Sequence, residues 1–249
     1  MYIRGVHQIK NLSELHELVR QTQLGQFTTG ISCADQPFLQ TTHIPWVLDV
    51  DESADEQHLG VLRGHIARVN PQTKAMIAAA AENGELEDEA LVIFTAKEHG
   101  YVTPKFYAET KPTTGKVVPT WNYSAVQVYG RVKIYDTAHP DTDAFLAQQI
   151  ADLSREGEAS MGFTGAKAWS VDDAPAGYVK QLKRAIVGVE IEITRIEGKA
   201  KMSQEMGKGD RQGVIDGFRE LGTDDGLAIA ATVERKGAEK DAAKAAEAA

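Results

Sequence analysis

Strict alternation of apolar and polar residues in one long segment constrains the fold of this 249-residue chain more than any other feature. In "AIVGVEIEITRIEGKAKMS", Val187, Val189, Ile191 and Ile193 alternate with glycine, glutamate and threonine. A period of two is typical of a strand with one buried face. The segment "VQVYGRVKIY", residues 126–135, alternates in the same way. We therefore expect the chain to be built around two long strands.

Shorter predicted elements surround these strands. Further strands are predicted in "GQFTTGI", "FLQTTHIPWVLDV" and "ALVIFTA". Pro45 interrupts the second, which predicts an edge strand or a bend, because proline lacks the N–H that a central ladder needs. Helices are predicted over residues 11–20, from Pro71 with Asn70 as N-cap, and near 140–156, 175–184 and 210–221. Strands scattered among helices without regular βαβ spacing predict a mainly β (α+β) fold, an antiparallel β-barrel decorated by helices.

The chain has no internal repeat and no linker rich in proline, glycine or serine, which favours a single domain over residues 1–235. The remaining residues, 236–249, are rich in alanine and charge and have no apolar stripe. That composition is typical of a frayed helix or a disordered tail, and we expect it to be functionally inert.

Composition excludes several classes of protein. A single cysteine, Cys33, rules out an internal disulfide framework, and the seven histidines show no convincing metal spacing, so no metal site is predicted. No apolar run approaches the ~20 residues of a membrane span, and the N-terminus lacks a signal pattern, so we expect a cytoplasmic protein without a membrane partner. A net charge of −9 argues against direct nucleic-acid binding.

Four polar clusters remain as candidate sites, because the P-loop, GxGxxG, GxSxG and HExxH signatures are missing from the sequence. The clusters are "TTHIPW" (41–46), "RGHIARVNP" (63–71), "PTWNY" (119–123) and "EGKAKMSQ" (197–204). In the second cluster we expect a short helix with His65 and Arg68 on one face, beside Arg63. Cations at a helix N-terminus describe a phosphate pocket. A surface helix with ordinary charges is the alternative.

The last two clusters offer a ring surface and a pair of cations. In "PTWNY", Trp121 and Tyr123 share one strand face, and Asn122 lies on the other. Two aromatic residues at this spacing are typical of a core, but their rings also suit a flat heterocycle. In "EGKAKMSQ", Lys199 and Lys201 share a face, which is an anion site or simply a solvated strand end.

In this order, the clusters resemble the FMN-binding negative transcriptional regulators, the PaiB-like family. The matching segments are "MYI", "TTHIPW", "LRGHIARVNP", "HGYVTPKFY", "KVVPTWNY", "AIVGVEIEITRIEGKAKMSQ" and "DRQGV", which together extend to about residue 221. One departure is Glu205, because the family usually has asparagine there. The resemblance implies an antiparallel split β-barrel of the pyridoxamine-phosphate-oxidase type, built as a homodimer, with FMN near the subunit interface. The residues that it implies at or near the flavin are His43, Arg63, His65, Arg68, Asn70, Trp121, Asn122, Tyr123, Lys201, Ser203 and Gln204.

Three functions are compatible with this resemblance. The first is an oxidoreductase whose FMN takes electrons from a nicotinamide donor and passes them to a small molecule, although no dedicated nicotinamide site is visible. The second is a transcriptional regulator that acts through DNA or a partner protein, or indirectly through a ligand or redox state. The third keeps the barrel but holds haem, with His43, His65 or His99 as an axial ligand.

Overall fold

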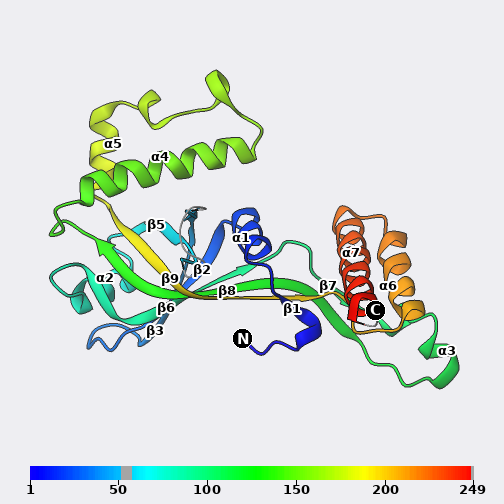
Figure 1. Cartoon of the computed structure of the whole chain (residues 1–249). Coiled ribbons are helices and arrows are strands. Elements are labelled where there is room, and N and C mark those ends of the chain that lie inside the picture. Colours follow the sequence, from blue (N-terminus) through cyan, green and yellow to red (C-terminus); the bar gives the residue numbers. More distant parts are fainter. Residues whose placement is uncertain (52–57, 248–249) are drawn as a thin grey trace. The chain divides into compact units, whose positions relative to one another are not determined.

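The structure, a computed structural model, describes residues 1–51 and 58–247 (Figure 1). The chain divides into two compact units, each assembled from separate segments. Unit 1 comprises Met1–Thr22, Thr95–Val126 and Glu197–Ala249, and unit 2 comprises Gln23–Phe94 and Gln127–Ile196. The two long strands expected from the sequence, β8 (Thr120–Tyr135) and β9 (Ile186–Lys201), each run from one unit into the other.

Unit 2 contains a sheet in which hydrogen-bonded neighbours follow the order β3-β2-β6-β8-β9-β5-β4. The shorter strands are β2 (Leu24–Gly30), β3 (Leu39–Pro45), β4 (Val47–Asp49), β5 (Val61–Ala67) and β6 (Glu85–Thr95). The β2–β3, β2–β6, β4–β5 and β5–β9 pairs are all antiparallel. Pro45 ends β3, which lies at the edge of the sheet, so the prediction of an edge strand is confirmed.

The core of unit 2 follows the alternation seen in the sequence. Val187, Val189, Ile191 and Ile193 are all buried, as predicted for one face of β9. Gly130 on β8 lies so close to the backbone oxygen of Glu192 that a Cβ would clash with it. A glycine is therefore required where the two long strands approach each other.

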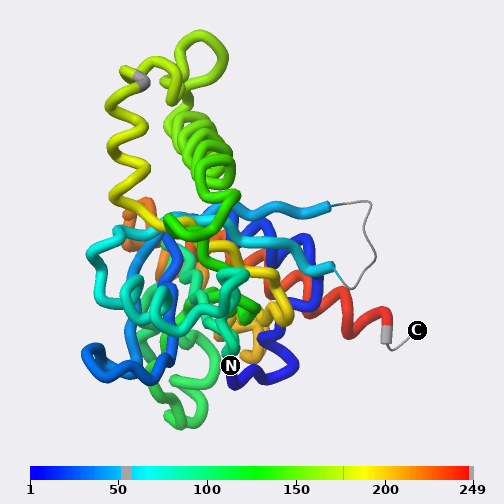
Figure 2. The backbone as a smooth tube through the Cα atoms, turned by 90° about the vertical axis from the view of Figure 1, so that its left-hand side faces the viewer, coloured from blue at the N-terminus to red at the C-terminus, as the bar shows by residue number. Residues whose placement is uncertain are grey.

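Three helices accompany the sheet of unit 2: α2 (Pro71–Ala79), α4 (Thr142–Ser160) and α5 (Ala176–Lys183). Asn70 caps α2 as predicted, because its side-chain oxygen accepts a hydrogen bond from the N–H of Gln72 at 2.9 Å. On α4, Leu146, Gln149 and Asp152 are buried. In both views α4 and α5 form an arm on one side of the sheet of unit 2 (Figures 1 and 2).

Unit 1 is built around the other ends of the two long strands. Strand β1 (Gln8–Ile9) pairs with the end of β9, and β7 (Gly100–Val102) pairs with the start of β8, both antiparallel. The helices of this unit are α1 (Leu12–Gln21), α3 (Thr110–Thr114), α6 (Lys208–Glu220) and α7 (Asp224–Glu247). Helices α6 and α7 lie side by side (Figure 1), and their buried residues include Val214, Phe218, Ile229 and Val233.

Helix α7 runs past the predicted boundary between residues 235 and 236. The tail was expected to be either a frayed helix or disordered, and its described residues 236–247 are helical. Lys236 is buried, and its Nζ donates hydrogen bonds to Glu14 at 2.5 Å and to Glu239 at 2.9 Å. The first turns of the tail therefore pack into unit 1.

A membrane-spanning segment would need a long and largely apolar helix. No helix within residues 1–51 and 58–247 meets that requirement.

Candidate functional site

The short helix predicted around His65 and Arg68 is wrong, because residues 61–67 form strand β5. Leu62, Gly64 and Ile66 face the core, so the segment has a period of two. Its register with β9 pairs His65 with Gly188. A helix of a few residues forms a costly nucleus for few hydrogen bonds, whereas pairing with β9 satisfies the backbone along the strand. The predicted geometry of the phosphate pocket is absent from this segment.

Arg63 and His65 project from β5 toward neighbouring elements of unit 2. The Arg63 guanidinium donates to both oxygens of Asp49 and, at 2.8 Å, to Asp152 on α4. The hydrogen bond to Asp49 and the attraction of both carboxylates raise the pKa of Arg63 against the opposing effect of burial. His65 Nδ1 lies 2.7 Å from Gln149 Oε1, also on α4. These contacts fasten α4 to the sheet.

The remaining predicted residues of unit 2 are Arg68, Asn70 and His43. Arg68 donates to the backbone oxygens of Arg184 at 3.0 Å and Ile186 at 3.1 Å. Besides capping α2, Asn70 donates from Nδ2 to Thr42 Oγ1 at 3.0 Å. His43 lies exposed on the edge strand β3. Arg68 and Asn70 thus hold chain segments of unit 2 together, whereas His43 is open to a ligand.

The six other predicted residues lie in unit 1, around the ends of β8 and β9. Trp121 is 48% exposed, whereas Asn122 is fully buried, so the two faces predicted for "PTWNY" are confirmed. Strand β7 sets Tyr101 directly opposite Trp121, with ring centroids 6.2 Å apart. The centroid of the His99 ring also lies 6.2 Å from the centroid of the Trp121 ring. Three exposed rings therefore meet at the start of β8.

Two lysines of β9 extend this ring surface. Lys199 Nζ lies 5.3 Å from the centroid of the Tyr123 ring. Lys201 Nζ donates to Thr120 Oγ1 and, at 3.1 Å, to the backbone oxygen of Trp121. Burial lowers the pKa of Lys201, and the nearby positive charges of Lys199 and Arg4 act in the same direction. We call Tyr101, Trp121, Tyr123, Lys199 and Lys201 the aromatic–lysine face.

Ser203 and Gln204 lie in the turn after β9, away from solvent. Ser203 adopts a left-handed φ of 58°, which is rare for a residue other than glycine. Its hydroxyl lies 3.1 Å from Asn122 Oδ1, while Asn122 Nδ2 is buried without a hydrogen-bond partner among the described residues. Gln204 bonds within its own turn: its Oε1 accepts from Met202 N–H and its Nε2 donates to Ala200 O. A strained turn and an unpaired amide thus lie directly behind the exposed rings.

Sequence reasoning missed two residues at this turn, His7 and Glu205. His7 is 2% exposed, and its Nε2 lies 3.1 Å from Glu205 Oε2. The other carboxylate oxygen of Glu205 lies 4.0 Å from Lys201 Nζ. The departure from the family pattern at position 205 was a sequence signal for one member of this pair, Glu205. Nothing local marked His7, which is 198 positions away.

A segment far along the chain supports the loop that follows β7. Asp210, in the "DRQGV" segment, accepts hydrogen bonds from the N–H groups of Glu109 at 2.8 Å and Thr110 at 2.9 Å, and from the Thr110 hydroxyl. Burial opposes the charged carboxylate, but these hydrogen bonds outweigh it and hold the pKa of Asp210 below its usual range. Helix α6 thereby fixes residues 109–110.

The chemistry of the aromatic–lysine face fits a flat, anionic ligand. The exposed rings offer π surface to a planar heterocycle, and the two lysines offer positive charge to a phosphate. The residues of this face therefore offer FMN both an aromatic surface and positive charge, whereas Arg63 and His65 of β5 are engaged by α4.

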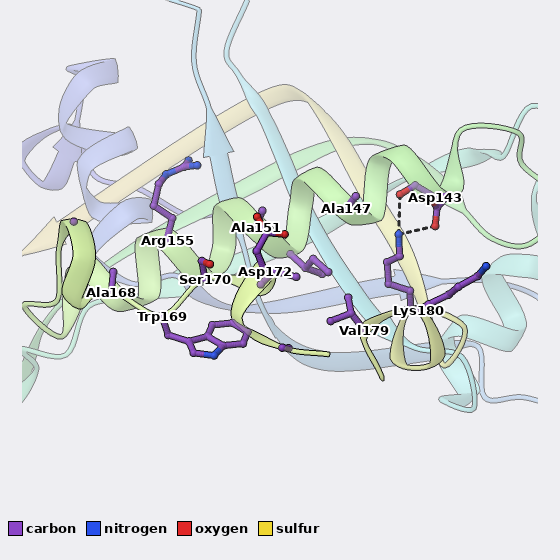
Figure 3. Close-up of a pocket in the computed structure, with 15 residues that line it drawn as sticks. Asp143, Ala147, Ala151, Arg155, Ala168, Trp169, Ser170, Asp172, Val179 and Lys180 are labelled. Atoms are coloured by element: carbon purple, nitrogen blue, oxygen red, sulfur yellow. Dashed lines mark hydrogen bonds and ion pairs between the residues drawn. The ribbon is translucent and has the colours of Figure 1, made fainter. Parts of the chain in front are cut away.

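A large cavity lies elsewhere, in unit 2, and none of the eleven predicted residues lines it. It measures about 810 Å³ and lies between α4 and residues 165–183. Figure 3 shows Ala147 and Ala151 on α4 facing Val179 and Trp169, with an ion pair between Asp143 and Lys183 at one end. Charged side chains also line it, among them Arg155, Asp172 and Lys180.

Comparison with known proteins shows which family and which relatives the chain is similar to. A family model described as "Putative FMN-binding domain" matches residues 1–195. An uncharacterized protein of Aspergillus fumigatus is 49% identical, over 97% of this chain and 99% of its own length. An uncharacterized protein of Emericella nidulans is 51% identical over the same shares. The Protease synthase and sporulation protein PAI 2 of Bacillus subtilis is 24% identical, over 87% of this chain and 88% of its own.

Proposed function

The chain belongs to the family of FMN-binding domains, and on this premise we propose that it is a flavin-dependent oxidoreductase acting on a small molecule. The family expected from the sequence is confirmed, and with it FMN as the cofactor. The antiparallel sheet agrees with the expected fold, a split β-barrel with helical additions. The observation that carries the proposal is the aromatic–lysine face of unit 1.

In this proposal each part of the face serves one part of FMN. Trp121 and Tyr101 hold the planar ring, since aromatic side chains stack on flat heterocycles. Lys199 and Lys201 attract the phosphate. Lys201 is held in place by Thr120 and the Trp121 backbone, so little freedom is lost when an anion arrives. When bound, FMN supplies hydride and single-electron transfer.

An oxidoreductase accounts for this exposed face better than a DNA-binding protein does. Half-exposed rings leave one side of a stacked ligand open to a second small molecule, such as a nicotinamide donor. The chain carries a net charge of −9, which opposes approach to a polyanion. The homodimer and the cytoplasmic location also belong to this proposal and rest on the family resemblance and the sequence. A dimer interface would bury ~2,000 Å² or more.

The visible spectrum of the purified protein tests the proposal, followed by acid release and mass identification of the chromophore. We expect a flavin spectrum that bleaches when NADH or NADPH is added without oxygen, and returns with air. Trp121→Ala should reduce flavin content, while Trp169→Ala, at the cavity of unit 2, should not. A Soret band, or a colourless protein that takes up no FMN, would overturn the assignment of the cofactor. A flavin that no nicotinamide reduces would overturn the proposed donor.

A further inference from the structure

A second pocket in unit 1 combines unusual charge with a buried histidine. It measures about 520 Å³ and lies between the N-terminal residues 5–10 and helix α7. The polar side chains that line it are His7, Gln8, Lys10, Gln204, Lys236, Glu239, Lys240 and Lys244. Its size falls within the range of small-molecule sites. The family match ends at residue 195, so α7 lies outside it.

The charge of this pocket runs against that of the whole chain. Four lysines and one glutamate line it, in a chain whose net charge is −9. Lys236, Lys240 and Lys244 recur every four residues, so they lie along one face of α7. Like charges at this spacing destabilise a helix unless an anion neutralises them.

The first of these lysines is neutralised by described carboxylates. Lys236 is paired with Glu14 and Glu239. Lys10 and Lys240 form no ion pair with a described side chain. Arg211 first, and the charges of Lys208 and Lys240 as well, lower the pKa of Asp241, so these lysines share one carboxylate. The lining of the pocket still holds more lysines than carboxylates around a concave surface.

His7 adds a directed group at the inner side of the pocket. Its side chain is 1% exposed, and its Nδ1 has no hydrogen-bond partner in the described part of the chain. Nε2 is engaged by Glu205, so Nδ1 is the nitrogen left for another molecule. A buried polar atom without a partner is costly, and a bound ligand is one way to satisfy it.

A neighbouring pocket widens the same cationic surface. It measures about 480 Å³, and its charged lining residues are Lys208, Arg211, Lys240 and Lys244 together with one carboxylate, Asp241. Arg211 is already paired with Asp241, whereas Lys208 has no ion pair among the described residues. Lys240 and Lys244 thus stand between two hollows, where one elongated anion would contact both.

We propose that these two pockets form a site for an organic polyphosphate, a small molecule with several linked phosphate groups. Lysines from two segments, Lys10 and the α7 residues Lys240 and Lys244, match several linked phosphates better than a single anion. A buried histidine at the inner wall favours a small molecule over a nucleic-acid duplex, which contacts convex or groove-shaped basic surfaces. Its lysines lie outside the aromatic–lysine face, so the proposal does not depend on the proposed oxidoreductase, although His7 is linked to Lys201 through Glu205.

Calorimetric titration of the full-length protein with inorganic tripolyphosphate tests this proposal. We expect saturable binding that is at least tenfold weaker in the double variant Lys240→Gln/Lys244→Gln. The matched control is Lys74→Gln/Lys167→Gln, which removes two exposed lysines of unit 2 and should bind as the parent does. Sulfate, with a single anionic centre, should bind at least tenfold more weakly than tripolyphosphate.

Flavin content and circular dichroism show whether the double variant still folds and still binds its cofactor. Both should be unchanged in Lys240→Gln/Lys244→Gln, because neither lysine lies in the aromatic–lysine face. Equal affinity of the double variant and the parent, or an equal loss in the control, would overturn the site. A 20-base-pair duplex that displaces tripolyphosphate and binds more tightly through the same lysines would assign the surface to nucleic acid instead.

Discussion

Glu205 joins a buried histidine to a lysine of the aromatic–lysine face: its Oε2 lies 3.1 Å from His7 Nε2, and its Oε1 lies 4.0 Å from Lys201 Nζ. The carboxylate therefore offsets positive charge at the place where we propose that a phosphate binds.

Glu205→Gln should strengthen FMN binding. The substitution removes a negative charge near the proposed phosphate position and keeps a side chain of similar size. Two charges a few ångströms apart near a surface interact by a few kcal/mol at most, and screening reduces this, so we expect a gain of about 3- to 10-fold. Fluorescence titration with FMN and riboflavin measures it. Riboflavin, which has no phosphate, serves as the control, and an equal gain for both would contradict the charge argument.

Lys201→Ala should weaken FMN binding by roughly 10- to 100-fold, because a hydrogen bond to a charged group contributes about 1.5–3 kcal/mol. Riboflavin should lose much less, since only the fixing of Thr120 and the Trp121 backbone is lost. Lys201→Arg should restore part of the FMN affinity. The same titration reports all three.

Arg68→Ala distinguishes the two candidate positions for the phosphate. Its guanidinium donates to Arg184 O and Ile186 O, so we expect a lower Tm with no selective loss of FMN over riboflavin. A selective loss of FMN in this variant, and none in Lys201→Ala, would place the phosphate at Arg68, as the sequence predicted.

Asp152→Asn should destabilise unit 2 at neutral pH. The carboxylate is 6% exposed, and although burial opposes its charge, hydrogen bonds from Gln148, Arg63 and Arg155 lower its pKa. A carboxyl with a lowered pKa stabilises the fold above its unfolded pKa of about 3.9, and this contribution disappears as the pH falls through the folded value. We expect a loss of about 2–4 kcal/mol at pH 7. Urea unfolding at pH 7 and pH 3 should show the difference shrinking in acid, and a constant difference would contradict this account.

Truncation after Arg235 should lower the Tm by several degrees. It removes Lys236, which Glu14 engages, and Asp241, which pairs with the buried Arg211. Deletion of residues 246–249 alone is the control and should leave the Tm unchanged. Differential scanning calorimetry measures both, and equal Tm values for the parent and the longer truncation would show that the tail is inert, as its composition suggested.

Local periodicity predicted the strands well, because the alternation of buried and exposed residues can be recognised from adjacent positions in the sequence. The two faces of β8 at Trp121 and Asn122, and the cap at Asn70, follow from such short-range patterns. The region around His65 was mispredicted because its structure depends on pairing with Gly188, more than a hundred residues later. The role of Arg63 could not be predicted either, since Asp152 reaches it only once α4 has packed.

The candidate site was harder to predict than the fold. The resemblance implied eleven residues, but pairs such as Tyr101 with Trp121 exist only through the β7–β8 register. His7 and Glu205 meet across almost the whole length of the chain. No pattern within a few residues marks such a contact, so tertiary structure was needed to find it.

Strand β1 pairs with Gly198 and Lys199, so unit 1 brings together the first and the last parts of the chain. On a ribosome that adds about 5–20 residues per second, Gln8 and Ile9 wait about 10–40 seconds before their partners are synthesised. Unit 2 ends at Ile196, so all of its residues exist before those partners do. During that interval the nascent N-terminus carries strand β1 and helix α1 without their final neighbours. We therefore expect codon choice and chaperone access during this interval to affect the correct folding of unit 1 more than that of unit 2.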